Sequence, residues 1–349
     1  MDAKQKKWLW LSIGLSMVIL LVVLVLTFDE DTVEALKNLN PWYLLLAFCL
    51  HMLAMCVWAV RIQVMCKALG YVIPFFHSLN MVCAGQLVAS ITPSQIGGEP
   101  VRIHELYKAN MPIADATAVV LIERLLEAVL LVIGVIIGMG LFSLAGGEGL
   151  VPDYMITAAW IGTGFFVGLL VLIIVLFSRP DWVRKITFKT VKFFTKKWET
   201  ERVEKLITQI DEAIDRLFLT FRMFTGKARM GLILGFLLSV VFWVCEYSIA
   251  SVIMMGLGYP PNLLISIVFQ LIIAIILMLP TTPGGAGIAE ISYAAFYSLI
   301  LPTSVVGLFV ILQRLIMYYS NILIGFIASF RIVKREAANE KVEIQEGQG

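Results

Sequence analysis

The sequence has 349 residues, of which 60% are apolar and 15% are charged, and its mean hydropathy is +0.90. Soluble domains are about 45–50% apolar and about 25% charged, so a water-soluble enzyme is excluded. The net charge of +2 is too small to indicate binding to nucleic acid. The five cysteines stand singly in apolar stretches, so neither a disulfide framework nor a metal site is expected.

Six apolar stretches are long enough to cross a bilayer, which takes about 20 residues. They cover residues 8–28, 41–60, 113–142, 155–178, 230–256 and 303–329. Two further apolar stretches, 71–110 and 262–300, are interrupted at mid-length by Pro and paired Gly, which break helices. We therefore expect an all-α polytopic membrane protein with about six transmembrane helices and two re-entrant helical hairpins.

The placement of Lys and Arg sets the expected orientation, because cytoplasmic loops carry an excess of both. Lysines within residues 4–7 precede the first span and acidic residues within 29–34 follow it, so the N-terminus should be cytoplasmic. The segment 179–229 carries 13 Lys and Arg against 7 Asp and Glu, and it lies inside only if residues 71–110 return to the side they came from. This predicts a multi-pass protein of the cell membrane with both termini in the cytoplasm.

An internal repeat supports the two hairpins. A shift of 190 residues superposes Thr92-Pro93 on Thr282-Pro283 and Arg124 on Arg314, and a shift of 188 aligns Leu69-Gly70-Tyr71 with Leu257-Gly258-Tyr259. Each repeat consists of a span, a Gly-Tyr turn, a hairpin and a span, and the two begin on opposite faces. Such inverted-topology repeats are typical of transporters, whose substrate site lies between the repeats near the bilayer midplane.

The expected domain order follows from these boundaries. It is an N-terminal transmembrane helix and external loop (1–40), repeat 1 (41–142), a transmembrane helix (143–178), a basic amphipathic cytoplasmic insert (179–229), repeat 2 (230–330) and a cytoplasmic tail (331–349). In the insert, apolar residues at helical spacing predict an amphipathic helix: Val203, Leu206, Ile207, Ile210, Ile214 and Leu217. Two interpretations of its lysine-rich and aromatic first part stay open, a positive-inside anchor or a surface that gathers anionic lipid.

The strongest local signal is Gly97-Gly98-Glu99-Pro100-Val101-Arg102, after the predicted break at Pro93. A helix that starts here points its positive N-terminal end into the membrane, where an anion would bind. Arg102 adds a guanidinium suited to phosphate, and Glu99 would hold it when the site is empty. The alternative is that Glu99 and Arg102 form an ion pair that only locks the hairpin.

The second hairpin offers a similar set. Gly284 and Gly285 would contribute to substrate binding with Glu290, and Pro283 and Gly287 would break the helix.

Charged residues within the spans complete the predicted site. Glu123, Arg124 and Glu127 fall in the span 113–142, and Arg314 matches Arg124 in the repeat. Charges at membrane depth are costly, so these groups should face the interior and pair. A salt-bridge network and contact with substrate are both open for them. Glu246 is a further intramembrane acid that could carry a proton.

The enzyme signatures that we considered are absent from the sequence. None of the three histidines stands in an HExxH motif, and there is no GxSxG motif or P-loop. His104 could contact a headgroup, although a structural role is the more common one for a lone histidine beside an acid. We expect a transporter rather than an enzyme, with no cofactor.

Three motifs resemble a known family. They are Pro93 with Gly97-Gly98-Glu99-Pro100-Val101-Arg102, Glu123-Arg124-Leu125-Leu126-Glu127, and the segment 280–287 with Glu290. They are similar to the membrane domain of lysylphosphatidylglycerol synthase and flippase proteins, and the likeness covers nearly the whole chain. The resemblance implies that the protein moves lipids between leaflets, such as aminoacylated phosphatidylglycerol or a polyprenyl phosphate. This chain ends about 20 residues after its last span, so it is expected to be the stand-alone form, without the soluble transferase and its lysyl transfer.

The function expected from residues and resemblance together is a flippase that moves an anionic, phosphate-bearing lipid by alternating access. The alternatives are an ion-coupled carrier of a small organic anion, a membrane-embedded lipid-modifying enzyme, and a non-catalytic scaffold. The expected partners are membrane lipids and no nucleic acid, with a homo-oligomer or a lipid-synthesis enzyme as further candidates.

Overall fold

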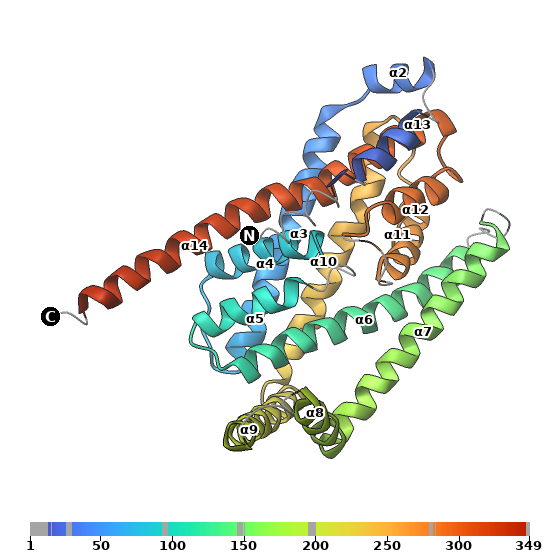
Figure 1. Cartoon of the computed structure of the whole chain (residues 1–349). Coiled ribbons are helices and arrows are strands. Elements are labelled where there is room, and N and C mark those ends of the chain that lie inside the picture. The colour runs from blue at the N-terminus through green and yellow to red at the C-terminus, as the bar shows by residue number, and fades with distance from the viewer. Residues whose placement is uncertain are drawn as a thin grey trace.

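The computed structural model describes residues 13–14, 16–25, 30–92, 97–144, 149, 151–194, 200–278, 282 and 284–346. Within these ranges all regular structure is helical (Figure 1). An apolar helix at Ser16–Val25 precedes the labelled elements. These are α2 (Glu30–Lys37), α3 (Pro41–Ala68), α4 (Phe75–Ser90), α5 (Gly98–Lys108), α6 (Ile113–Leu144), α7 (Asp153–Ser178), α8 (Pro180–Phe194), α9 (Thr200–Thr225), α10 (Arg229–Gly256), α11 (Leu263–Met278), α12 (Ile288–Tyr297), α13 (Thr303–Arg314), a π-helical turn η1 (Leu315–Tyr319) and α14 (Ser320–Glu346).

Five helices in the described part of the chain are long and apolar enough to cross a membrane. They are α3, α6, α10, the stretch Ala159–Leu176 of α7, and the continuous stretch Thr303–Ala337 formed by α13, η1 and α14. The predicted all-α polytopic architecture is therefore confirmed. Of the first predicted span, 8–28, the structure describes residues 13–14 and 16–25, and the apolar helix Ser16–Val25 is shorter than the five spanning helices.

Two spans run further than the sequence indicates. Helix α3 continues to Ala68 rather than ending near residue 60, so Arg61 lies within the helix and not in a flanking loop. Helix α14 continues to Glu346 through the predicted tail. In both cases polar residues extend an apolar helix whose end cannot be located from hydropathy alone.

The two interrupted stretches form helical hairpins. Helices α4 and α5 are separated by residues 91–97, and helices α11 and α12 by residues 279–287. The predicted breaks at Pro93 and Pro283 lie outside the described residues. The side of the membrane from which each hairpin enters stays a prediction.

The turns that follow α3 and α10 have the same geometry. Gly70 has a φ of 93° and Gly258 a φ of 85°, a conformation that side chains with a Cβ rarely adopt. The amide of Tyr71 donates to the Cys66 carbonyl at 3.0 Å, and the amide of Tyr259 donates to the Met254 carbonyl at 2.9 Å. The Leu-Gly-Tyr match in the sequence thus corresponds to two like helix ends, each closed by the residue after the glycine.

The two halves exchange their packing partners. Helices α3 and α10, which begin the two predicted repeats, pack along one another at the centre (Figure 1). Helix α4 of the first hairpin packs against α14, and α11 of the second hairpin packs against α6. The first helix of each hairpin therefore packs against the last long helix of the other half, whereas the second helix packs within its own half, α5 on α6 and α12 on α13.

The polar insert contains α8 and α9, and α9 packs against α6 and α10. All six apolar residues that predict the amphipathic helix lie in α9, where Ile214 is buried and the other five are partly buried. Arg216 of α9 donates to Asp115 at the start of α6 at 3.0 and 3.1 Å. This contact raises the pKa of Arg216, because the neighbouring carboxylate stabilises its charged form.

Candidate functional site

Arg61 is the centre of a buried ionic network between α3, α6 and α10. Its guanidinium is fully buried and donates to Glu123 at 2.6 and 3.0 Å, to Glu127 at 2.7 Å and to the Ser239 hydroxyl at 2.9 Å. Glu123 and Glu127 both face it because they stand one helical turn apart on α6. Trp58 completes this group, because its indole N–H donates to Glu123 at 2.7 Å.

Arg102 of α5 joins the same network. It is 1% exposed and donates to Glu123 at 3.0 Å and to Glu99 at 3.3 Å. Its guanidinium also lies 5.0 Å from the centre of the Trp58 ring, a cation–π arrangement. Arg102 therefore has protein partners on several sides and does not line the cavity described below.

Arg124 occupies a different position from Arg61 and Arg102. Its Nε lies 2.6 Å from a carboxylate oxygen of Glu99, and its terminal nitrogen donates to Glu127. The side chain of Arg124 is 37% exposed and that of Glu99 is 20% exposed. The three arginines and three glutamates balance in charge, and Arg124 is the arginine of this network that is open to a ligand.

A corresponding ion pair lies in the second half. Nε of Arg314, at the end of α13, is 2.9 Å from a carboxylate oxygen of Glu290, which is in the first turn of α12. Glu290 also accepts from the Gly287 amide at 2.6 Å and from the Ser16 hydroxyl. In each half, an arginine of the last span thus holds an acid that begins the second helix of the hairpin, where the helix dipole favours a negative charge.

The breaks of the two hairpins are in contact with one another. The amide of Gly284 donates to the Thr92 carbonyl at 3.2 Å, and a Cβ on Gly284 would lie 2.3 Å from the Ser90 carbonyl oxygen. Gly284 has a φ of 59°, in the left-handed region. The Tyr318 hydroxyl also donates to the Ser90 carbonyl at 3.4 Å. The close approach of two main chains, together with this φ, explains the glycine.

Gly97 and Gly98 are required for a different reason. A Cβ on Gly97 would lie 2.6 Å from the Thr92 side chain, and a Cβ on Gly98 would lie 3.0 Å from the Gly85 carbonyl oxygen. The Gly97 amide, just before α5, donates to the Thr92 hydroxyl at 2.9 Å, which links the two ends of the break. These glycines allow α4 and α5 to approach closely, whereas Gly97 itself has an ordinary φ of −67°.

A cavity of about 310 Å³ lies between the two ion pairs. Its charged lining residues are Glu99, Arg124, Glu127, Glu246 and Arg314. One part of the wall is apolar and comes from α11 and η1, with Ile273, Ala274, Leu277, Met278 and Met317. The cavity therefore combines two guanidinium groups with a surface that can contact hydrocarbon.

Glu246, which lines this cavity, forms a pair with His51 that the sequence does not indicate. Nδ1 of His51 in α3 lies 2.8 Å from a carboxylate oxygen of Glu246 in α10, and Nε2 lies 3.0 Å from the amide oxygen of Asn321 in α14. His51 is 1% exposed and Glu246 is 4% exposed. The partners are separated by 195 and 270 positions, so only the folded chain brings them together.

Comparison with known proteins places this arrangement in a family. The family described as the lysylphosphatidylglycerol synthase TM region matches residues 9–325. The chain belongs to this family. A UPF0104 membrane protein of Archaeoglobus fulgidus is 32% identical over 338 residues, which cover 93% of this chain and 97% of the relative. A UPF0104 membrane protein of Methanocaldococcus jannaschii is 28% identical, over 89% of this chain and 91% of the relative. One of Methanothermobacter thermautotrophicus is 25% identical, over 86% of this chain and 89% of the relative.

Membership of the lysylphosphatidylglycerol synthase TM region and the long apolar helices together establish a multi-pass membrane protein. Most of the predicted site residues lie in two groups beside one cavity. Glu99, Arg102, Glu123, Arg124 and Glu127 form the first group, and Glu290 with Arg314 forms the second. Pro93 and Pro283 lie outside the described residues.

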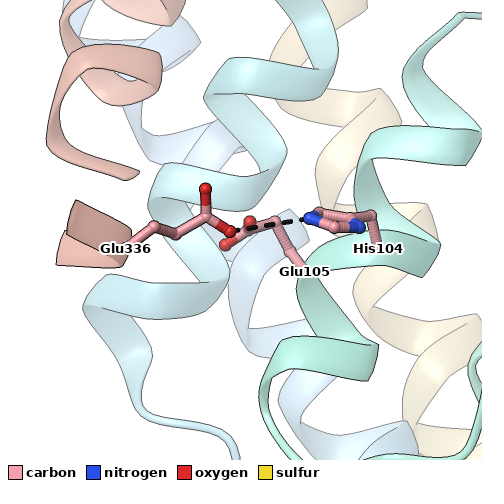
Figure 2. A group of neighbouring side chains, drawn as sticks. All are labelled: His104, Glu105 and Glu336. Atoms are coloured by element: carbon pink, nitrogen blue, oxygen red, sulfur yellow. Dashed lines mark ion pairs between the residues drawn. The ribbon is translucent and has the colours of Figure 1, made fainter. Parts of the chain in front are cut away.

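His104 lies apart from the cavity. Figure 2 shows it beside Glu105 of α5 and Glu336 of α14, with atoms that could serve as metal ligands within 4.8 Å of one another. Both carboxylates already face cations, because Arg335 donates to Glu105 at 2.6 Å and Lys108 lies 4.0 Å from Glu336. We interpret the group as an ion-paired link between α5 and α14 rather than a metal centre.

Proposed function

We propose that the protein moves an anionic, phosphate-bearing lipid between the leaflets of the cell membrane by alternating access. The observation that carries the proposal is the cavity between the halves, which is lined by Arg124 and Arg314 together with apolar side chains. A volume of about 310 Å³ is at the lower end of the range for ligand pockets, about 300–1,000 Å³. It suits a headgroup whose acyl or polyprenyl tails stay in the bilayer.

Arg124 and Arg314 are the groups that would hold the phosphate. Guanidinium groups form bidentate hydrogen bonds with phosphate oxygens. Each arginine contacts a carboxylate in a first helical turn, Glu99 or Glu290, and a bound phosphate would replace that carboxylate as the anion beside the helix end. Exchange of one anion for another avoids leaving a guanidinium unpaired within the membrane.

Arg102 would act through its neighbours. Because it is 1% exposed and donates to Glu99 and Glu123, it positions Glu99 for exchange and keeps the Arg61 network neutral. In this proposal Arg102 does not touch the lipid, and its loss would act through the placement of Glu99.

Alternating access would separate the hairpin breaks. Gly284 contacts Thr92, and Tyr318 contacts Ser90 at the cavity wall, so rocking of one half against the other would have to break both contacts. The packing of α4 on α14 and of α11 on α6 favours motion of the first helix of each hairpin together with the long helix of the other half.

In this proposal the lipid is not chemically altered while it moves, so the protein acts as a transporter and not as an enzyme. The proposal also includes the orientation predicted from Lys and Arg, with both termini in the cytoplasm. A phosphatidylglycerol and a polyprenyl phosphate both carry the required phosphate. A second copy of the chain or a lipid-synthesis enzyme are the protein partners that such a role would use.

The test is lipid movement in proteoliposomes that contain fluorescent phosphatidylglycerol or fluorescent polyprenyl phosphate. Loss of one charged hydrogen-bonding contact is worth about 1.5–3 kcal/mol, so Arg124→Gln and Arg314→Gln should each slow movement roughly tenfold to a hundredfold. Arg222→Gln on the exposed face of α9 is the matched control and should move lipid at the wild-type rate.

Three results would count against the proposal. Movement of neither lipid by the wild-type protein would reject it, and so would an unchanged rate in both arginine variants. Uptake of a small organic anion without lipid movement would favour the carrier instead. A changed headgroup mass after incubation would favour the lipid-modifying enzyme.

A further inference from the structure

His51, Glu246 and Asn321 link the central helices of the two halves beside the cavity. His51 is on α3 and Glu246 is on α10, the helices that begin the two predicted repeats, and Asn321 is on α14. Glu246 and Asn321 line the cavity, whereas His51 is 1% exposed behind them.

The hydrogen bonds fix where the protons are. The side-chain amide nitrogen of Asn321 donates to the Met317 carbonyl at 2.7 Å, so its oxygen faces Nε2 of His51. Nε2 must therefore carry a hydrogen and donate it. Nδ1 then faces the Glu246 carboxylate at 2.8 Å, and this contact is a hydrogen bond only if one further proton lies between the two atoms.

Loss of that proton would break the contact. A neutral imidazole with its hydrogen on Nε2 presents a lone pair at Nδ1, and at 2.8 Å this lone pair repels a carboxylate. The pair thus has two arrangements, closed with the proton and open without it, and the closed one joins α3 to α10.

The His51–Glu246 pair differs from the other ion pairs at the cavity because its charge can change. Among the described residues, the other carboxylates at the cavity pair with arginine, which does not release its proton in proteins. Histidine is the side chain that titrates near neutral pH. Within the described part of the chain, the other ionisable groups that face Glu246 or share its cavity are Cys245, Tyr247, Tyr293, Tyr318, Glu99, Arg124, Glu127 and Arg314. The neutral polar groups there are Trp58, Gln86, Ser90, Trp243, Gln270 and Asn321.

We propose that the His51–Glu246 pair is a proton-binding site and that one proton moves together with each lipid phosphate. This rests on the proposed function and adds its energy source. With the proton bound the pair is neutral overall, and the arginines can accept an anion. Without the proton the cavity carries one additional negative charge, which repels a phosphate. The pair takes up its proton from water on the acidic side of the membrane. When the cavity opens to the alkaline side, the proton leaves Nδ1 and Glu246 for water there.

The experiment imposes a pH difference of one unit across proteoliposomes. The probe is the fluorescent phosphatidylglycerol or polyprenyl phosphate that the wild-type protein moves, and its distribution between leaflets is read by quenching the outer leaflet. One proton per lipid predicts about tenfold enrichment in the leaflet on the alkaline side, since one pH unit corresponds to a factor of ten. Phosphatidylglycerol carries a single negative charge that the proton cancels, so for this probe a potassium diffusion potential should leave the enrichment unchanged.

Two variants and one control make the result specific. Glu246→Gln can still donate a hydrogen bond to Nδ1, so it should keep the closed contact, exchange lipid at equal pH and give equal leaflets under the gradient. His51→Asn should also abolish the enrichment. His104→Asn, an exposed histidine of α5, should behave as wild type.

The outcomes separate the two proposals. Movement of lipid by the wild type with equal leaflets under the gradient would overturn proton coupling and leave the flippase proposal standing. Enrichment that persists in Glu246→Gln would overturn the assignment of the site. Movement of neither probe lipid would overturn the proposed function, and the coupling with it.

Discussion

Replacement of Arg61 by Met should lower the stability of the protein strongly, because Arg61 balances two carboxylates inside the membrane. The guanidinium makes four hydrogen bonds, to Glu123, Glu127 and Ser239, and none of the charged groups involved is more than 2% exposed. Methionine fills a similar volume but leaves one negative charge uncompensated. Removal of one partner from a buried ion pair costs about 3–5 kcal/mol.

That loss can be measured as a shift in melting temperature. At about 2 °C per kcal/mol for a chain of this size, Arg61→Met should melt about 6–10 °C below the wild type. The assay is thermal unfolding of the full chain in detergent, followed by tryptophan fluorescence. Arg222→Met on α9 is the matched control and should melt close to the wild-type temperature.

A second substitution tests the reason for the loss. Glu127→Gln in the Arg61→Met background restores charge balance, and the remaining oxygen can still accept from Arg124. The double variant should therefore melt higher than Arg61→Met alone. A single variant within about 2 °C of the wild type, or a double variant less stable than the single one, would refute the reasoning.

Three further substitutions test other contacts. Gly284→Ala should lower the melting temperature by several degrees through the clash at the hairpin break and its positive φ, whereas Gly164→Ala, in open space on α7, should raise it slightly. Thr92→Val removes the hydroxyl that accepts from the Gly97 amide and should cost about 1 kcal/mol in chemical unfolding, against no change if this hydrogen bond is dispensable. Arg216→Gln should release α9 from α6, so limited trypsin digestion should cut α9 faster than in the wild type, while equal cleavage would show that the apolar face alone holds it.

The parts of the fold that are periodic or repeated can be predicted from the sequence. Hydropathy locates the long spans, and the Pro and Gly interruptions locate both hairpins. The shift of 190 residues pairs Arg124 with Arg314, and the structure gives each a carboxylate at an equivalent place in its hairpin. These features are predictable because they depend on local composition or on comparison of the chain with itself.

The rest of the site depends on contacts between distant segments. Arg61 stands where an apolar run ends, so its position suggests a cytoplasmic flank, although its partners Glu123 and Glu127 make it a buried residue. His51 has a polar neighbour only in the folded chain. Hydropathy averages over a window and therefore cannot distinguish a flanking charge from an interior one.

The exchanged packing has a consequence for how the protein is made. Helix α4 leaves the ribosome early, but the helix that covers it, α14, begins only at Ser320, after the other labelled helices. At about 5–20 residues per second, the first hairpin must remain in the bilayer for on the order of ten seconds or more before its partner arrives. Until α14 is made, the face of α4 that α14 covers in the finished fold lacks that partner.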